Sequence, residues 1–214
     1  MSQTIPIVFV VDDDISVRES LESLLRCEGW QPETYGSAKE FLARPWVQSP
    51  SCLILDISLP DVNGLDLQKR VAAERADMPI IFITGHGDVP MTVRAMKAGA
   101  QEFLLKPFRD DVLLIAVRQA LERSRIVLAR EMEMQTLRGR YASLTSRERQ
   151  VMALVAFGKP NKQVGCELGI SEITVKAHRG RVMEKMMADS IADLVKMAGK
   201  LRLIRASGVV ASVA

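Results

Sequence analysis

Residues 52–60, Cys-Leu-Ile-Leu-Asp-Ile-Ser-Leu-Pro, decide the fold of this chain. Their first four residues form an apolar run with the length of a short buried strand, and Asp56 closes the run. A loop that contains proline follows at once, so we expect the carboxylate of Asp56 at the edge of a sheet. A single acid at a strand end often only caps the next helix, and the partners of Asp56 therefore decide its role.

The same alternation of an apolar run and an amphipathic segment repeats along the first half of the chain. We predict strands at 5–11, 32–35, 52–56, 79–83 and 101–105. We predict helices at 15–28, 37–43, 64–73, 88–98 and from residue 110 onward. Strands that alternate with helices in this way predict an α/β doubly wound fold, a five-stranded parallel sheet of the flavodoxin-like type with helices on both faces.

Five polar residues stand at the carboxyl ends of the predicted strands: Asp12, Asp13, Asp56, Thr84 and Lys106. Ligands of doubly wound sheets bind beyond this edge, so we expect the five side chains to form one site. Neighbouring carboxylates repel one another, and Mg²⁺, which binds carboxylate and phosphate oxygens, relieves that repulsion. Thr84 and Lys106 suit a phosphoryl group, and Asp56 is then the nucleophile that forms an acyl phosphate.

The composition indicates an ordinary globular protein, with 214 residues of which 48% are hydrophobic and 26% charged. No apolar run is long enough to cross a membrane, and no basic segment precedes the first run as in a signal peptide. The chain has three cysteines, Cys27, Cys52 and Cys166. Their spacing matches no disulfide or metal motif, which fits a protein of the reducing cytoplasm. We therefore predict a cytoplasmic protein without a membrane partner.

The charge of the chain is divided between its two ends. Residues 1–139 have a net charge of −4 and residues 140–214 a net charge of +7. Two domains with different partners are therefore expected, and the second faces a polyanion. We predict one long helix over 110–138 between them, because its apolar residues keep a helical step; a fifth helix followed by a charged linker is the alternative.

The second half predicts four helices, at 146–156, 161–168, 172–187 and 190–203. Thr145 and Glu148 fit a capping box, and Asn161 and Ser171 are candidate N-caps of the next two helices. Gly169 suits the left-handed position of a tight turn, so the two middle helices form a helix-turn-helix pattern.

Helix 172–187 has two faces. We expect three residues to pack inward, namely Val175, Val182 and Met186, and four to face outward, namely Lys176, Ala177, Gly180 and Arg181. Three more lie on the flanks: Thr174, His178 and Arg179. Such a helix can enter the major groove of DNA, with Lys176 and Arg181 on base edges and the flanking residues on phosphates. Taken alone, a basic helix face is more often simply solvated.

Four segments resemble the receiver domain of bacterial response regulators, in the order and spacing of that family: Val-Val-Asp-Asp-Asp (10–14), Leu-Asp-Ile-Ser-Leu-Pro-Asp-Val-Asn-Gly (55–64), Phe-Ile-Thr-Gly-His-Gly-Asp-Val-Pro-Met (82–91) and Glu-Phe-Leu-Leu-Lys-Pro-Phe (102–108). The resemblance implies that Asp12, Asp13, Asp56 and the Ser58 carbonyl hold Mg²⁺. It also implies that Phe103 is the aromatic switch residue, although Phe103 can equally be interpreted as an ordinary core aromatic. It further implies that the Lys106–Pro107 bond is cis.

Two other classes of protein share parts of this pattern. Haloacid-dehalogenase-like phosphohydrolases also use a strand-end aspartate, but they need a second aspartate two residues later, where this chain has Ser58. Multiple-turnover hydrolysis is therefore not expected. A flavin-binding domain of the same topology is the other alternative, but flavin binding would not explain the pair of aspartates or Lys106.

Three later segments resemble the LuxR-type DNA-binding module: Leu-Thr-Ser-Arg-Glu-Arg-Gln-Val (144–151), Pro-Asn-Lys-Gln (160–163) and Ile-Ser-Glu-Ile-Thr-Val-Lys-Ala-His-Arg (170–179). The chain is thus similar to response regulators of the FixJ/NarL class, and most of all to the FixJ-like branch. Gly165 departs from the usual alanine, which lowers helix propensity by up to about 1 kcal/mol. Gly180 replaces a side chain that often touches DNA in relatives, so specificity at that position is expected to be relaxed or to move to Arg181.

The resemblance implies a receiver domain at 1–122, a helical linker at 123–142, a LuxR-type helix-turn-helix domain at 143–206 and a tail at 207–214. It implies that a sensor histidine kinase phosphorylates Asp56, that the phosphorylated protein forms a homodimer, and that the dimer binds promoter DNA and acts on RNA polymerase. Helix 190–203 is then the dimerisation helix. The alternative is a constitutive DNA-binding factor whose receiver is only a docking domain.

Overall fold

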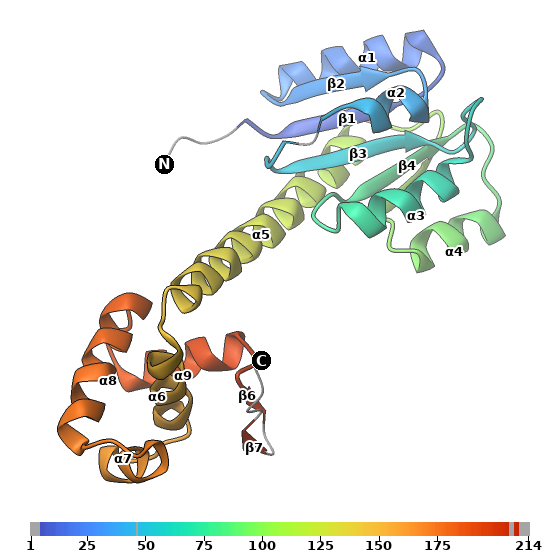
Figure 1. The fold of residues 1–214 in the computed structure, drawn as a ribbon. Helices are drawn as coiled ribbons and strands as arrows, with labels where there is room; N and C mark the ends of the chain where they lie inside the picture. The colour runs from blue at the N-terminus through green and yellow to red at the C-terminus, as the bar shows by residue number, and fades with distance from the viewer. Residues whose placement is uncertain (1–4, 46, 206–207, 210–214) are drawn as a thin grey trace. The chain divides into compact units, whose positions relative to one another are not determined.

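The computed structural model describes residues 5–45, 47–205 and 208–209, and it contains two compact units, residues 1–130 and 131–214 (Figure 1). The first unit is built on a five-stranded parallel sheet with the order β2-β1-β3-β4-β5, as the alternation of strands and helices predicts. Its strands are β1 (Ile7–Val11), β2 (Gln31–Tyr35), β3 (Ser51–Asp56), β4 (Ile80–Thr84) and β5 (Glu102–Leu105).

Helices cover both faces of this sheet (Figure 1). They are α1 (Ile15–Cys27), α2 (Ala38–Ala43), α3 (Gly64–Glu74), α4 (Val89–Lys97) and the start of α5 (Asp110–Ala142). One core lies under α1 and α5, where Leu25 and Val117 pack on strand residues such as Ile54. The other lies under α2, α3 and α4 and contains Phe41 and Leu67. Because both faces are covered, the central strands β1, β3 and β4 are buried along their whole length.

Helix α5 is one continuous helix of 33 residues, which confirms the prediction of a single long helix in this region. It passes through Gly139 and ends at Ala142, four residues beyond the predicted end. A glycine inside a helix costs about 1 kcal/mol relative to alanine, and the other residues of this long helix outweigh that cost at the exposed position 139. Leu113 near the start of α5 packs on the sheet, and Leu137 near its end belongs to the core of the second unit.

The second unit contains the four predicted helices, α6 (Ser146–Ala156), α7 (Asn161–Leu168), α8 (Glu172–Met186) and α9 (Ile191–Lys200), followed by short paired strands β6 (Ile204–Arg205) and β7 (Gly208–Val209). Helix α9 is shorter than the predicted 190–203, and the β6–β7 pair was not predicted. Most of the predicted tail, 207–214, lies outside the described residues. Val151, Val164, Val182 and Leu194 bring one residue from each helix into a common core.

The predicted turn chemistry of this unit is correct in three places and wrong in one. Thr145 and Glu148 form the capping box, Ser171 caps α8 by accepting the amide of Thr174, and Gly169 is left-handed with φ of 66°. Asn161 is not an N-cap: Pro160 occupies that position without a side-chain cap, and Asn161 is the first helical residue. The Oδ1 atom of Asn161 instead accepts a hydrogen bond from Arg179 of α8, at 3.1 Å.

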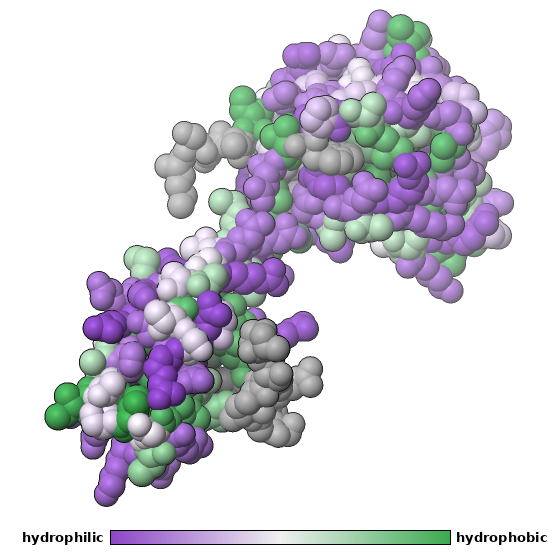
Figure 2. Space-filling view, viewed as in Figure 1, coloured by the Kyte–Doolittle hydropathy of each residue, from purple (hydrophilic) through white to green (hydrophobic). Residues whose placement is uncertain are grey.

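Hydrophilic side chains cover most of the surface in view on both units (Figure 2). Hydrophobic residues occur there in small, separate groups. Within the described part of the chain, no helix combines the length and apolarity needed to cross a bilayer.

Candidate functional site

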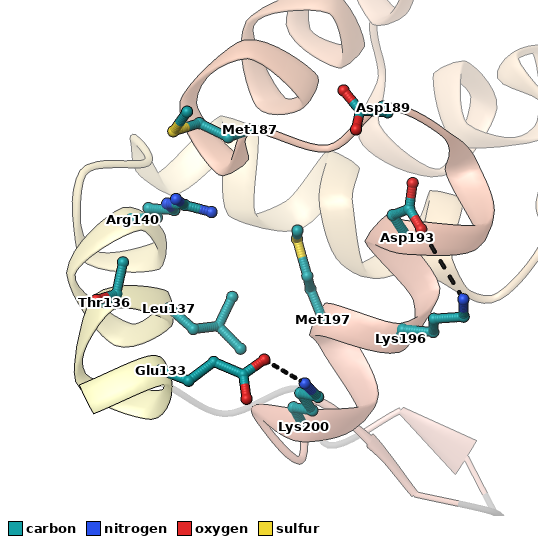
Figure 3. Close-up of a pocket in the computed structure, with 10 residues that line it drawn as sticks. All are labelled: Glu133, Thr136, Leu137, Arg140, Met187, Asp189, Asp193, Lys196, Met197 and Lys200. Carbon is teal, nitrogen blue, oxygen red and sulfur yellow. Dashed lines mark hydrogen bonds and ion pairs between the residues drawn. The ribbon is translucent and has the colours of Figure 1, made fainter. Parts of the chain in front are cut away.

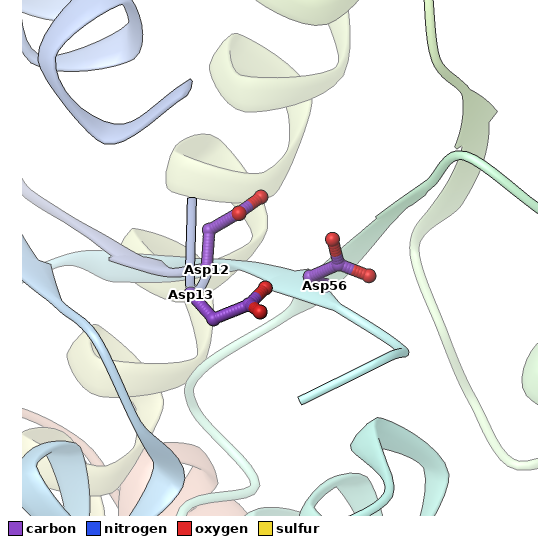
Figure 4. A group of neighbouring side chains, drawn as sticks. All are labelled: Asp12, Asp13 and Asp56. Atoms are coloured by element: carbon purple, nitrogen blue, oxygen red, sulfur yellow. The ribbon is translucent and has the colours of Figure 1, made fainter. Parts of the chain in front are cut away.

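The strand register explains how the acidic residues meet. Strands β1 and β3 are paired so that Val11 lies beside Leu55, which places Asp12 next to Asp56 at the carboxyl edge of the sheet. Asp13 follows Asp12 in the loop. One carboxylate oxygen of each of the three residues lies within 4.8 Å of the others, and Figure 4 shows the three side chains as neighbours at the strand ends. The sheet therefore brings together the three acids predicted from the sequence.

Lys106 reaches this cluster from the end of β5. Its Nζ atom donates hydrogen bonds to Asp12 Oδ2 at 2.6 Å and to Asp56 Oδ2 at 2.7 Å. Both carboxylates are buried, and the lysine side chain is 21% exposed. Burial raises the pKa of Asp12, although the hydrogen bond from Lys106 acts against it. Burial also opposes the charge of Lys106, but its bonds to both aspartates outweigh this effect and raise its pKa.

Backbone amides hold two of the carboxylates in place. The amide of Asp14 donates to Asp12 Oδ1 at 3.0 Å, and the amide of Ser58 donates to Asp56 Oδ1 at 2.9 Å. Each carboxylate thus uses one oxygen on the backbone and the other on Lys106. Ser58 stands in the loop directly after Asp56, and the role of its carbonyl stays a prediction.

Arg18 of α1 is a residue of this site that the sequence reasoning missed. Its Nη1 atom donates to the carbonyl oxygens of Asp12 and Asp13, at 2.6 and 2.9 Å. It therefore fixes the backbone that carries two of the acids. A basic residue one helical turn after an acidic loop is the only sequence signal for it, and that pattern is common on helix surfaces.

The loop after Asp56 is packed very closely against the strand end. A Cβ atom on Gly64 would lie 2.6 Å from the backbone oxygen of Asp56 and 2.8 Å from Ile57 Cα, so only glycine fits. The carboxylate of Asp61 accepts the amides of Ala38 and Lys39 at the start of α2, which anchors the same loop from its other side.

Thr84 ends β4 and is completely buried. Its hydroxyl donates to the carbonyl oxygen of His86 at 3.1 Å and accepts the amide of His86 at 3.3 Å. The hydroxyl is thus engaged within its own loop. The side chain of His86 is exposed, as expected for a loop residue.

Phe103 on β5 is half-buried, with its ring 6.2 Å from the ring of Phe82. The loop after β4 passes close to it, since a Cβ on Gly87 would lie 3.1 Å from the Phe103 ring. Backbone movement after Thr84 therefore meets this ring directly. The Lys106–Pro107 bond is cis, as the resemblance implied.

The cluster suits a hard divalent cation. Three carboxylates within 4.8 Å of one another carry more negative charge than the single ammonium of Lys106 balances. Mg²⁺ takes carboxylate oxygens together with waters and phosphate oxygens. The donor set of this chain therefore fits Mg²⁺ and a phosphoryl group.

Helix α8 has the two faces that its sequence predicts. Val175, Val182 and Met186 are fully buried. The outward residues are all exposed, namely Lys176, Ala177, Gly180 and Arg181, and the flanking residues are half-buried, namely Thr174, His178 and Arg179. The hydrogen bond from Arg179 to Asn161 ties the flank of α8 to the start of α7, a contact that the sequence did not predict.

Helix α4 also exposes apolar residues. Val89, Val93 and Met96 are exposed, as a dimerisation face would require, whereas only Ala95 is buried. Met91 of the same helix is half-buried and packs against the core beneath α4.

A pocket of about 370 Å³ lies between the end of α5 and α9 in the second unit (Figure 3). Leu137 and Met197 point into it, and two ion pairs cross its sides, Glu133 with Lys200 at 2.5 Å and Asp193 with Lys196 at 4.0 Å. Arg140 of the same lining donates to the Met186 carbonyl oxygen. Because the Glu133–Lys200 pair joins α5 to α9, we interpret the pocket as part of the packing between these two helices.

Together, the fold and the sites define a class of protein. A doubly wound domain with an acidic cluster and a lysine at its carboxyl edge precedes a helix-turn-helix domain with a basic outward helix. The first part matches the response regulator receiver domain over residues 8–118. The second matches the luxR family of bacterial regulatory proteins over residues 142–198.

Three relatives resemble the chain over nearly its full length. It is 52% identical over 200 residues to Nodulation protein W of Bradyrhizobium diazoefficiens, covering 94% of this chain and 88% of that protein. It is 42% identical over 198 residues to Transcriptional regulatory protein FixJ of Azorhizobium caulinodans, covering 92% and 93%. Its structure is similar to that of response regulator StyR, with a TM-score of 0.83, 48% identity, and coverage of 92% and 100%.

The chain therefore belongs to the two-component response regulators that combine a receiver domain with a LuxR-type DNA-binding domain, in the FixJ-like branch. Its function is that of a phosphorylation-controlled, DNA-binding regulator of transcription. Response regulators of this kind are typically not enzymes.

Proposed function

We propose that Asp56 is the residue that accepts the phosphoryl group from a sensor histidine kinase. The observation that supports this most directly is Lys106, which holds Asp12 and Asp56 together at 2.6 and 2.7 Å. An oxygen of Asp56 attacks phosphorus, the bond from phosphorus to the donor's imidazole nitrogen breaks, and the electron pair leaves with the imidazole. Lys106 stays beside the new acyl phosphate and balances part of its negative charge.

Asp12, Asp13, Asp56 and the Ser58 carbonyl would hold Mg²⁺ at this site. The ion supplies positive charge that lets carboxylates and phosphoryl oxygens approach one another. Ser58 stands where phosphohydrolases carry a second aspartate, so this chain offers no acid at that position and transfers one phosphoryl group to itself without multiple turnover.

Phosphorylation of the full chain by acetyl phosphate tests the assignment. With Mg²⁺ present, intact-mass measurement should show one phosphoryl adduct on the native protein and none on Asp56→Asn, which keeps the size of the side chain but removes the nucleophile. Asp66→Asn is the matched control, because Asp66 is exposed on α3 and, among the described residues, forms an ion pair only with Lys69. An adduct on Asp56→Asn would overturn the proposal.

The signal then passes through Thr84. Its hydroxyl must leave His86 to bond the phosphoryl group, and this movement shifts the loop that packs on Phe103. We place the receiver contact of the resulting homodimer on α4, where Val89, Val93 and Met96 are exposed. Ligand-driven switching requires the dimer to bind phosphate better than the monomer does. Sedimentation of the protein with and without a beryllofluoride mimic of the phosphoryl group should therefore show dimers only with the mimic.

The dimer would act in the cytoplasm, where it binds promoter DNA through α8 and contacts RNA polymerase. Two helices related by a two-fold axis read half-sites about one helical turn apart. Lys176 and Arg181 contact base edges beside Ala177, and Thr174, His178 and Arg179 contact phosphates. Equal DNA affinity before and after phosphorylation would instead favour a constitutive factor whose receiver only docks.

A further inference from the structure

The recognition helix α8 carries an apolar side chain that the proposed base contacts leave without a role. Ile173 is 80% exposed, which is the largest exposure of any large hydrophobic residue in the described part of the chain. It lies in the first turn of α8, two residues after the N-cap Ser171. The cap bonds the amide of Thr174, so the helix start does not depend on the isoleucine.

Ile173 belongs to one surface with the outward residues of α8. Positions 173, 176, 177, 180 and 181 recur at helical spacing and form a single stripe, which we call the outward stripe. At about 100° per residue, Ile173 lies opposite the buried residues Val175, Val182 and Met186. Packing against the domain core therefore cannot account for the choice of isoleucine.

The chemistry of the outward stripe favours DNA over an apolar protein surface. Between residues 173 and 181 it carries the cations Lys176 and Arg181 and no acid, and the exposed Glu184 continues it one turn later. Ala177 and Gly180 keep its centre flat, and a Cβ on Gly180 would meet nothing within 4 Å. A flat, positively charged surface with one apolar side chain at the helix N-terminus matches a major groove. Residues at that end of a recognition helix are the ones that reach base edges.

We propose that Ile173 reads thymine by contacting its C5-methyl group. Among the four bases, only thymine presents an apolar group in the major groove, and apolar side chains recognise it there. Ile173 then specifies one T·A pair in each half-site, next to the pairs read by Lys176. This inference rests on the proposal that α8 is the recognition helix.

The test uses the full chain after treatment with acetyl phosphate and Mg²⁺. Tight-binding duplexes are first selected from a synthetic pool with a randomised core. In the best duplex, each thymine is then replaced in turn by uracil, which lacks only the C5-methyl group. Losing contact with one methyl should weaken binding of the native protein about fourfold. In Ile173→Ala the same uracil should cause no further loss, while Ile173→Val should stay sensitive.

Lys176→Ala separates this inference from the function on which it rests. If Lys176→Ala binds as the native protein does, or if no duplex is enriched, α8 does not read DNA and both proposals fail. If Lys176→Ala weakens binding but uracil acts equally on the native protein and on Ile173→Ala, only the thymine contact is overturned. The thymine contact is also overturned if the selected half-site contains no thymine. It is overturned likewise if Ile173→Ala binds DNA as the native protein does but captures RNA polymerase more weakly.

Discussion

Replacing Lys106 by methionine should make the receiver domain unstable without metal and unusually responsive to Mg²⁺. Lys106 is the only cation bonded to the carboxylates of Asp12 and Asp56 among the described residues, at 2.6 and 2.7 Å. Methionine keeps most of the side-chain length but removes the charge. The carboxylates of Asp12, Asp13 and Asp56 then repel one another with no ammonium between them.

The magnitude follows from the burial of the groups. Removing one partner of a buried ion pair costs about 3–5 kcal/mol, because the remaining charge is left uncompensated. Lys106 is 21% exposed, so water weakens the pair and we expect a loss of about 2–4 kcal/mol in the free energy of unfolding. Mg²⁺ no longer competes with the ammonium for the same oxygens, so it should bind more tightly and restore most of this loss.

Urea denaturation of the full chain, with EDTA or with Mg²⁺, measures both effects. The two tryptophans, Trp30 and Trp46, both lie within residues 1–130, so their fluorescence follows the first unit alone. Lys39→Met is the control, because Lys39 is an exposed receiver lysine outside the acidic cluster. If Lys106→Met and Lys39→Met lose the same stability in EDTA, or if Mg²⁺ stabilises both equally, Lys106 does not balance the charge of this site.

Three further predictions concern the second unit. In Gly165→Ala, the new Cβ would lie 2.7 Å from the Ile170 carbonyl oxygen. The overpacking should destabilise the domain by about 1–3 kcal/mol, which outweighs the gain of about 1 kcal/mol in helix propensity. In the control Gly139→Ala the new Cβ meets nothing within 4 Å, so this variant should be more stable than the native protein. Equal shifts of the melting temperature in the two variants would contradict this prediction. The hydrogen bond from Lys185 lowers the pKa of Glu148 from 4.5 to about 2, so its contribution to folding is complete above pH 4.5 and is lost as the pH falls toward 2. The stability difference between the native protein and Glu148→Gln should therefore shrink by about 1–3 kcal/mol over that range in urea denaturation, and a constant difference would refute the pairing. Lys176→Ala should lose about 1–3 kcal/mol of binding free energy on selected DNA and little on scrambled DNA. Arg179→Ala should weaken binding to both DNAs alike and reduce the salt dependence of binding. If Lys176→Ala loses the same affinity for both DNAs, Lys176 does not read bases.

The sequence determined the features that depend on local order along the chain. Strand ends in a parallel sheet share one edge, so the positions of Asp12, Asp56 and Lys106 at strand ends were sufficient to predict that they meet. Helical spacing was likewise sufficient to separate the buried face of α8 from its exposed face. In both cases, the geometry of a single element or a single sheet rule fixes the outcome.

The tertiary structure decided the contacts between segments that are distant in sequence. The sequence left Arg18 unnoticed on the surface of α1 and expected Asn161 to cap α7. It also interpreted Gly165 through helix propensity alone, whereas the close approach of Ile170 requires a glycine there. Each outcome depends on how two elements approach each other to within a few ångströms, and periodicity and propensity describe one element at a time.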